Sequence, residues 1–100
     1  MPRVVVKNFW SYDYDECNIQ IPLLKDLKQM FIGRVQFVDI CGDECKKDVE
    51  KYNVKTYPTI VIECDGQEKE RFIGLTQERF LQRAIQKILS ECNEGLPRRV

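Results

Sequence analysis

The segment KYNVKTYPTIVIECDGQEKERFIG, residues 51–74, decides the fold. Pro58 disfavours the helical region for the residue before it, so the chain must be extended there. Residues 59–63, TIVIE, form an apolar, β-branched run that is typical of a buried strand. The Asp-Gly pair at 65–66 is a strong hairpin signal, and residues 69–73 return as a second strand. The segment therefore predicts an extended approach followed by an antiparallel hairpin.

Hydrophobic periodicity predicts the elements on both sides of this hairpin. A β-branched run opens the chain as a strand, and a second apolar run follows the first helical pattern. We expect Pro22 to bend the first helix or delay its start. The expected elements are a strand over 4–10, a helix from 15 or 16 to 31, a strand over 35–40, a short helix over 45–52 and a helix after Thr76.

The order β-α-β-α-β-β-α predicts an α/β domain with a central four-stranded mixed sheet flanked by three helices. The first two strands are joined through a helix and should be parallel. We expect Gly42-Asp43 to form a turn that is followed by the N-cap of the short helix, and Thr76 to cap the last helix. A stripe of Phe80, Ala84 and Ile88 should be the buried face of that last helix, with Leu81, Ile85 and Leu89 beside it.

Length, charge and composition exclude several classes of function. The chain has 100 residues, 16 basic and 16 acidic side chains, and no histidine. One domain over residues 1–93 with a tail over 94–100 fits this length. Zero formal charge gives no general attraction to nucleic acid or to anionic membrane. The absence of histidine removes histidine general bases and His-ligated metals. No apolar run spans a bilayer or resembles a signal peptide, which favours the cytoplasm.

Several short motifs occur together at the spacing of a known family. Phe9-Trp10 is followed at the right distance by Cys17, and Pro22 lies five residues further on. The stretch ending in Pro58-Thr59 and the later Gly74 complete the set. The sequence resembles the thioredoxin family in its minimal form over roughly residues 4–90. This resemblance implies that Pro58 is the cis proline facing the redox edge and that Gly74 lies beside the substrate groove.

The residues that carry the family's chemistry are incomplete. The resemblance places the exposed nucleophilic cysteine at position 14, where this chain has Tyr14. Cys17 holds the position of the second, resolving cysteine. Asn8 replaces the family's buried acid, and an amide cannot take a proton. A phenol with a pKa near 10 does not exchange with disulfides. The sequence therefore disfavours ordinary dithiol reduction of protein disulfides.

The remaining cysteines leave alternatives open. Cys17 is either a semi-buried small hydrophobe or a residual single thiol at a helix start. Cys41 and Cys45 follow the second strand and either pack in the core or pair with Cys17 as a rebuilt redox couple. An iron–sulfur site is the least favoured hypothesis, because Cys64 and Cys92 should lie far from that edge. We expect no cofactor and no metal.

The same edge of the predicted sheet carries a candidate binding surface. Residues near the former active site offer an apolar patch, and an extended partner segment could pair with the backbone before Pro58. Acidic residues around it favour a basic protein partner. The competing interpretations are a core role for Trp10 and an ordinary solvated loop for the acids. The patch comprises Trp10, Tyr14, Tyr57, Pro58 and Gly74, and the acidic rim comprises Asp13, Asp15, Glu16, Asp43 and Glu44.

Overall fold

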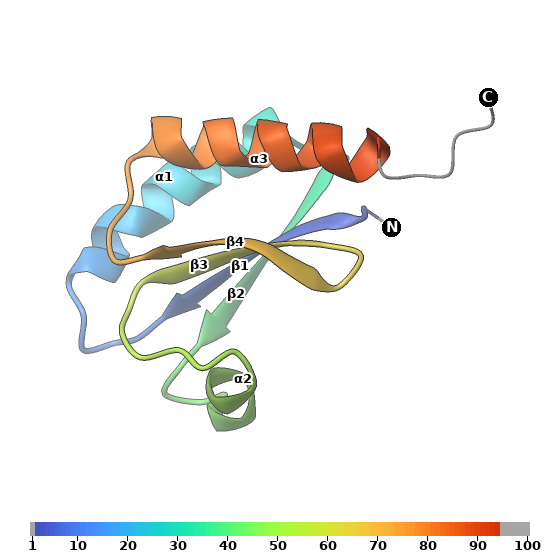
Figure 1. The fold of residues 1–100 in the computed structure, drawn as a ribbon. Coiled ribbons are helices and arrows are strands. Elements are labelled where there is room, and N and C mark those ends of the chain that lie inside the picture. Colours follow the sequence, from blue (N-terminus) through green and yellow to red (C-terminus); the bar gives the residue numbers. More distant parts are fainter. Residues whose placement is uncertain (1, 95–100) are drawn as a thin grey trace.

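A computed structural model of the chain describes residues 2–94. Its elements follow the predicted order, and the α/β class with four strands and three helices is confirmed (Figure 1). The expected tail falls almost wholly outside the described residues. The elements are β1 (Val4–Trp10), α1 (Glu16–Met30), β2 (Val35–Cys41), α2 (Lys46–Lys51), β3 (Thr59–Cys64), β4 (Gln67–Ile73) and α3 (Glu78–Glu94).

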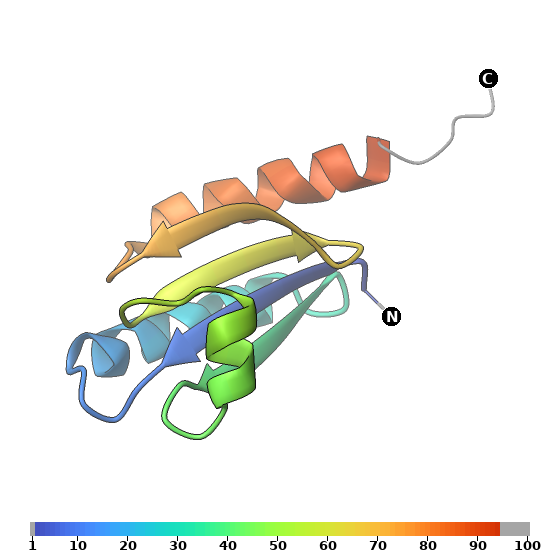
Figure 2. The ribbon, with the colours of Figure 1, turned by 60° about the horizontal axis from the view of Figure 1, so that its bottom comes forward.

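The sheet has the strand order β2-β1-β3-β4. β1 and β2 are parallel, as a strand pair joined through a helix requires, whereas β3 is antiparallel to both β1 and β4. α1 and α3 lie together on one face of the sheet, and α2 lies on the other face (Figures 1 and 2). The parallel pair therefore ends at one edge of the molecule, where β3 begins.

Two apolar clusters hold the layers together. Every residue of β3 is buried, because helices cover both of its faces. The larger cluster joins the sheet to α1 and α3, with Leu27, Ile60 and Ile85 fully buried at its centre. A smaller cluster around Phe9 and Val61 joins the sheet to α2. Each such side chain contributes about 1.5–3 kcal/mol relative to an exposed position.

One capping expectation and one packing expectation are wrong. Cys45, two residues after the Gly42-Asp43 turn, occupies the N-cap position of α2, and the carboxylate of Asp43 binds the loop over residues 11–12. Thr76 lies two residues before α3, and its backbone bonds to Gln20 of α1. Phe80 is 42% exposed, since the buried stripe of α3 runs through Leu81, Ala84, Ile85, Ile88, Leu89 and Cys92.

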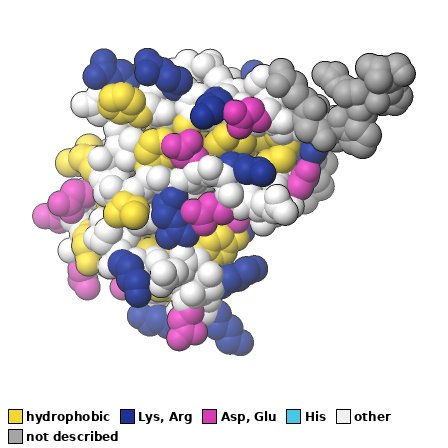
Figure 3. Space-filling view, in the orientation of Figure 1, with side chains coloured by type: hydrophobic (Ala, Val, Ile, Leu, Met, Phe, Trp, Pro, Cys, Tyr) yellow, Lys and Arg dark blue, Asp and Glu magenta, His cyan; other side chains and the backbone are white. Residues whose placement is uncertain are grey.

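Pro22 lies inside α1, which begins at Glu16 without a late start. The loss of one backbone donor there is tolerated on a partly exposed helix. Within residues 2–94, no helix is long and apolar enough to cross a membrane. Acidic and basic side chains are interspersed over the face shown in Figure 3, in keeping with the zero formal charge.

Candidate functional site

The predicted edge is assembled by the ends of four strands. Trp10 pairs with Cys41 where the parallel strands β1 and β2 end, and Phe9 pairs with Thr59 where β3 begins. The register therefore brings the residues before β3 to the ends of β1 and β2. The loop after β4 closes the edge, because the amide of Gly74 donates to the carbonyl of Pro58 at 2.8 Å.

An aromatic pair lies across this edge. The rings of Tyr14 and Tyr57 make an edge-to-face contact with centroids 5.3 Å apart. The Tyr57–Pro58 peptide bond is cis, and Pro58 is buried while Tyr14 is 36% exposed. Gly42 makes room for the Tyr57 ring, because a Cβ at position 42 would overlap the hydroxyl end of that ring. The two tyrosines thus form an ordered apolar wall beside Pro58.

Cys17 lies in the first turn of α1 and is only 2% exposed. Burial raises the pKa of its thiol, a backbone hydrogen bond with Ser11 opposes this, and the charges of Glu16 and Asp43 add to the increase. A nucleophilic cysteine needs the opposite shift, because the thiolate is the reactive form. The position at the helix start therefore does not activate this thiol.

We expect the alkylation of Cys17 by iodoacetamide at neutral pH to be at least about tenfold slower than that of half-buried Cys45, because the rate follows thiolate fraction and exposure. The rate at Cys17 should still be rising at pH 9, its ordinary pKa, because the pKa is shifted upward. Peptide mass mapping of timed samples measures both rates. A plateau at Cys17 below pH 8 would contradict the raised pKa.

Cys41 and Cys45 lie at the same edge as free thiols. The amide of Cys45 donates to the carbonyl of Cys41 at 2.9 Å, so both belong to one turn after β2. Burial raises the pKa of Tyr57, and the charges of Asp43, Tyr14, Cys41 and Cys17 raise it further. Cys41 and Cys17 therefore lie within electrostatic reach of the same ring. Neither Cys41 nor Cys45 is bonded to Cys17.

One residue of the acidic rim, Asp43, has a structural role. The carboxylate of Asp43 accepts hydrogen bonds from the Ser11 hydroxyl at 3.0 Å and from the Tyr12 amide at 2.9 Å. These bonds lower the pKa of Asp43, with the nearby Lys46 charge assisting. Asp43 therefore fastens the loop before α1 to the loop after β2. Of the other rim acids, Asp13, Asp15 and Glu16 are exposed and Glu44 lies in the same turn as Cys45.

Among the residues of the predicted apolar patch, Trp10 is the least connected to the others. Its ring is half-buried and contacts Tyr12, with centroids 4.8 Å apart. Its carbonyl accepts the Gly42 amide at 2.7 Å, so it holds the edge through its backbone. Asn8, which replaces the family's buried acid, donates to Asp39 at 3.3 Å and is 2% exposed.

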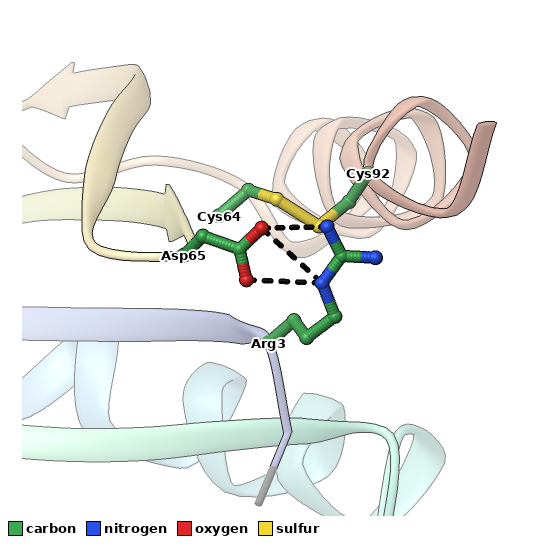
Figure 4. Close-up of a disulfide and its surroundings, with 4 residues drawn as sticks. All are labelled: Arg3, Cys64, Asp65 and Cys92. Atoms are coloured by element: carbon green, nitrogen blue, oxygen red, sulfur yellow. Dashed lines mark hydrogen bonds and ion pairs between the residues drawn. A yellow bond between two sulfur atoms is a disulfide. The ribbon is translucent and has the colours of Figure 1, made fainter. Parts of the chain in front are cut away.

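A second cysteine pair lies at the opposite end of β1. Cys64 and Cys92 form a disulfide that joins the end of β3 to α3, beside the ion pair of Arg3 with Asp65 (Figure 4). Cys64 pairs with Val4, six residues along β1 from Trp10, which is about 20 Å at 3.3 Å per residue. The five cysteines thus form two separate groups, and they do not supply four ligands for a cluster in one place. Sequence reasoning did not pair these two residues.

Comparisons with known proteins place the chain in a family. The Thioredoxin family model matches residues 2–87. The chain belongs to the thioredoxin family. A thioredoxin of Bacillus subtilis is 30% identical over 86 residues, covering 86% of this chain and 83% of that protein. A chloroplastic thioredoxin M2 of Arabidopsis thaliana is 32% identical over 85 residues, covering 85% of this chain and 46% of that protein.

Solved thioredoxin structures share the architecture. The thioredoxin of Fasciola hepatica superposes with a TM-score of 0.78 at 29% identity, covering 85% of this chain and 80% of that one. A mutant thioredoxin from Halobacterium salinarum gives a TM-score of 0.79 at 26% identity, covering 86% of this chain and 74% of that one. The chain spans about half the length of the chloroplastic relatives that it matches.

Proposed function

We propose that this thioredoxin-family protein binds an extended segment of a partner protein at the edge around Pro58, without the dithiol reductase activity that the family resemblance implies. The observation that carries the proposal is the Tyr14–Tyr57 contact. An aromatic wall stands where the resemblance places the nucleophilic thiol, and Cys17 behind it is buried with a raised pKa. Any remaining chemistry would be that of the single thiol of Cys17.

The chemistry of the edge favours a basic partner. The exposed residues Asp13 and Asp15 flank Tyr14 in the chain, and Ile73 and Leu75 on either side of Gly74 are 68% and 44% exposed. An extended segment can pair its backbone beside Pro58 and place apolar side chains on this surface. Positive charge at the ends of that segment would complement the rim and speed association. Trp10 would support this surface from below.

A binding titration tests this proposal. A cysteine-free, Lys-rich peptide of about ten residues, long enough to add one strand, should shift the backbone amide signals of residues 57–59 and 73–75 in an NMR titration. Tyr57→Ala should weaken binding by about 2 kcal/mol, the usual cost of truncating an aromatic hot spot. Gly42→Ala should also weaken peptide binding, since a methyl group at position 42 displaces the Tyr57 ring.

Ile32→Ala is the matched control, because Ile32 is 71% exposed and lies in the turn before β2, at the other end of that strand. Equal weakening by Ile32→Ala and Tyr57→Ala would contradict a site at Pro58. So would signal changes confined to residues away from both segments.

The missing nucleophile can be restored. We expect Tyr14→Cys to raise the rate of insulin disulfide reduction by about tenfold or more, because it places a thiol on the exposed side of the edge, three residues before Cys17. Tyr14→Ser is the matched control and should remain at the level of the unmodified chain. A Tyr14→Cys variant as inactive as Tyr14→Ser would show that the edge has lost more than one side chain.

A thiol–disulfide oxidoreductase with a Cys17–Cys41 or Cys17–Cys45 couple is the alternative. Two observations favour this alternative. Cys17, Cys41 and Cys45 are all free thiols, and Cys17 and Cys41 both lie near Tyr57. Insulin reduction by the unmodified chain that is abolished by Cys17→Ser would establish this alternative over partner binding. We propose the cytoplasm as the compartment of the protein, which requires that the Cys64–Cys92 bond can exchange with cellular thiols.

A further inference from the structure

The Cys64–Cys92 disulfide lies in a pocket of its own. The pocket has a volume of about 230 Å³ and is lined by side chains from the start of the chain, from the β3–β4 turn and from α3. Both sulfur-bearing residues line it and retain 7% and 6% of their surface exposed. The pocket offers a small molecule a space beside the bond.

The charged groups at the pocket divide into two sets. Arg3 and Asp65 are joined to each other by an ion pair and by hydrogen bonds of 2.5 to 3.2 Å (Figure 4). Lys69 and Glu91 also line the pocket. The charge of Lys69 acts on Asp65 and helps to lower the pKa of that carboxylate, whereas Glu91 forms no ion pair in the described part of the chain. The pocket that holds the disulfide is therefore also lined by an ammonium group near Asp65 and by a carboxylate outside any ion pair.

We propose that Cys64–Cys92 is a second, exchangeable redox site, independent of the edge at Cys17, and that it reacts with a small thiol carrying both an ammonium and a carboxylate group. Lys69 binds the carboxylate of that thiol and Glu91 binds its ammonium. The pairing orients the thiol toward the sulfur atoms in the pocket. This function goes beyond the proposed binding of a protein segment.

The exchange takes place in two steps that balance. The thiolate of one small thiol attacks a sulfur of the bond, and the electron pair of the S–S bond leaves on the other sulfur. A second small thiol attacks the mixed disulfide. Two small thiols are thereby oxidised to one disulfide, and Cys64 and Cys92 gain two electrons and the two protons that the small thiols lose.

Timed reduction of the folded chain tests this proposal. Glutathione is the charged probe and 2-mercaptoethanol the uncharged one, with quenching by alkylation and mass mapping of the Cys64 and Cys92 peptides. Both thiols should reduce the bond in folded protein. The double variant Lys69→Gln/Glu91→Gln should slow glutathione by about two- to fivefold, the value of exposed charge pairs. It should leave 2-mercaptoethanol unchanged.

The controls separate this site from the rest of the molecule. Lys25→Gln, on the exposed side of α1, should alter neither rate. Cys17→Ser should also alter neither, which distinguishes this site from the edge at Pro58. Two outcomes overturn the proposal. One is a bond that is reduced only when the chain is unfolded in urea. The other is a Lys69→Gln/Glu91→Gln variant in which the rates of reduction by glutathione and by 2-mercaptoethanol change by the same factor.

Discussion

Replacing Cys64 and Cys92 together by alanine is expected to lower the free energy of unfolding by about 3–4 kcal/mol. The disulfide closes a loop with a sequence separation of 28, and cross-linking such a loop restricts the unfolded chain. In a domain of this size the loss corresponds to about 15–25 °C in Tm. Urea unfolding followed by the fluorescence of Trp10, the single tryptophan, measures the change.

Two controls belong to this measurement. The unmodified chain under dithiothreitol should unfold at nearly the same urea concentration as the double variant, because both lack the cross-link. Cys17→Ala removes a buried thiol that forms no disulfide, so it should cost only about 1 kcal/mol. If reduction leaves the urea midpoint of the unmodified chain in place, the disulfide does not stabilise the fold.

The element order could be predicted because local signals agree with the tertiary structure. The β-branched run of β3 is buried on both faces, and the Asp-Gly pair makes the turn that it predicts, with Asp65 and Gly66 at positive φ. The same agreement placed Tyr14, Tyr57 and Pro58 at one edge, because parallel strands end together. Periodicity and topology were sufficient for these features.

Features that depend on contacts with residues far away in the sequence were not predictable in this way. Asp43 precedes a short helix and has the side chain of a cap, but two donors of the neighbouring loop bind it. Phe80 lies at helical spacing from Ala84, but α3 is rotated so that Leu81 faces the sheet. A rotation of one residue about the helix axis is about 100°, and periodicity defines a stripe only within that range.

The Cys64–Cys92 pair left a usable signal in the sequence. Cys92 is four residues after Ile88 and continues the buried stripe of α3, so its side chain had to face the sheet. Cys64 ends β3, an inner strand of the sheet that α3 contacts. The sequence favours the cytoplasm, where thiols are kept reduced, and so gives no reason to pair the two residues.

Replacing Lys7 by methionine is expected to destabilise the chain by about 2–3 kcal/mol, because it leaves a buried carboxylate without its cation. The Glu63 side chain is 5% exposed and lies 3.4 Å from the Lys7 ammonium. The Tyr52 hydroxyl donates to Glu63 at 2.5 Å and accepts from Lys7 at 2.5 Å. This network ties β1 and β3 to the end of α2.

The double variant Lys7→Met/Glu63→Gln separates lost charge from lost packing. The glutamine side chain is neutral and still accepts from Tyr52, so the double variant should recover to within about 1 kcal/mol of the unmodified chain. A double variant as unstable as Lys7→Met alone would mean that the lysine acts through its packing over the Tyr52 ring, 4.7 Å from its centroid.

The pH dependence of the Lys7→Met effect gives an independent test. Burial acts to lower the pKa of Lys7, but the hydrogen bond with Tyr52 and the charge of Glu63 outweigh it and leave the pKa above its ordinary 10.5. Burial and Glu63 also raise the pKa of Tyr52.

A lysine whose pKa is higher in the folded chain than in the unfolded chain adds stability. That stability is fully present below the unfolded pKa and is lost as the pH rises through the folded pKa. The stability difference between the unmodified chain and Lys7→Met should therefore be constant near neutral pH and shrink above 10.5. A difference that persists unchanged into that range would show that the network stabilises the fold by shape and not by charge.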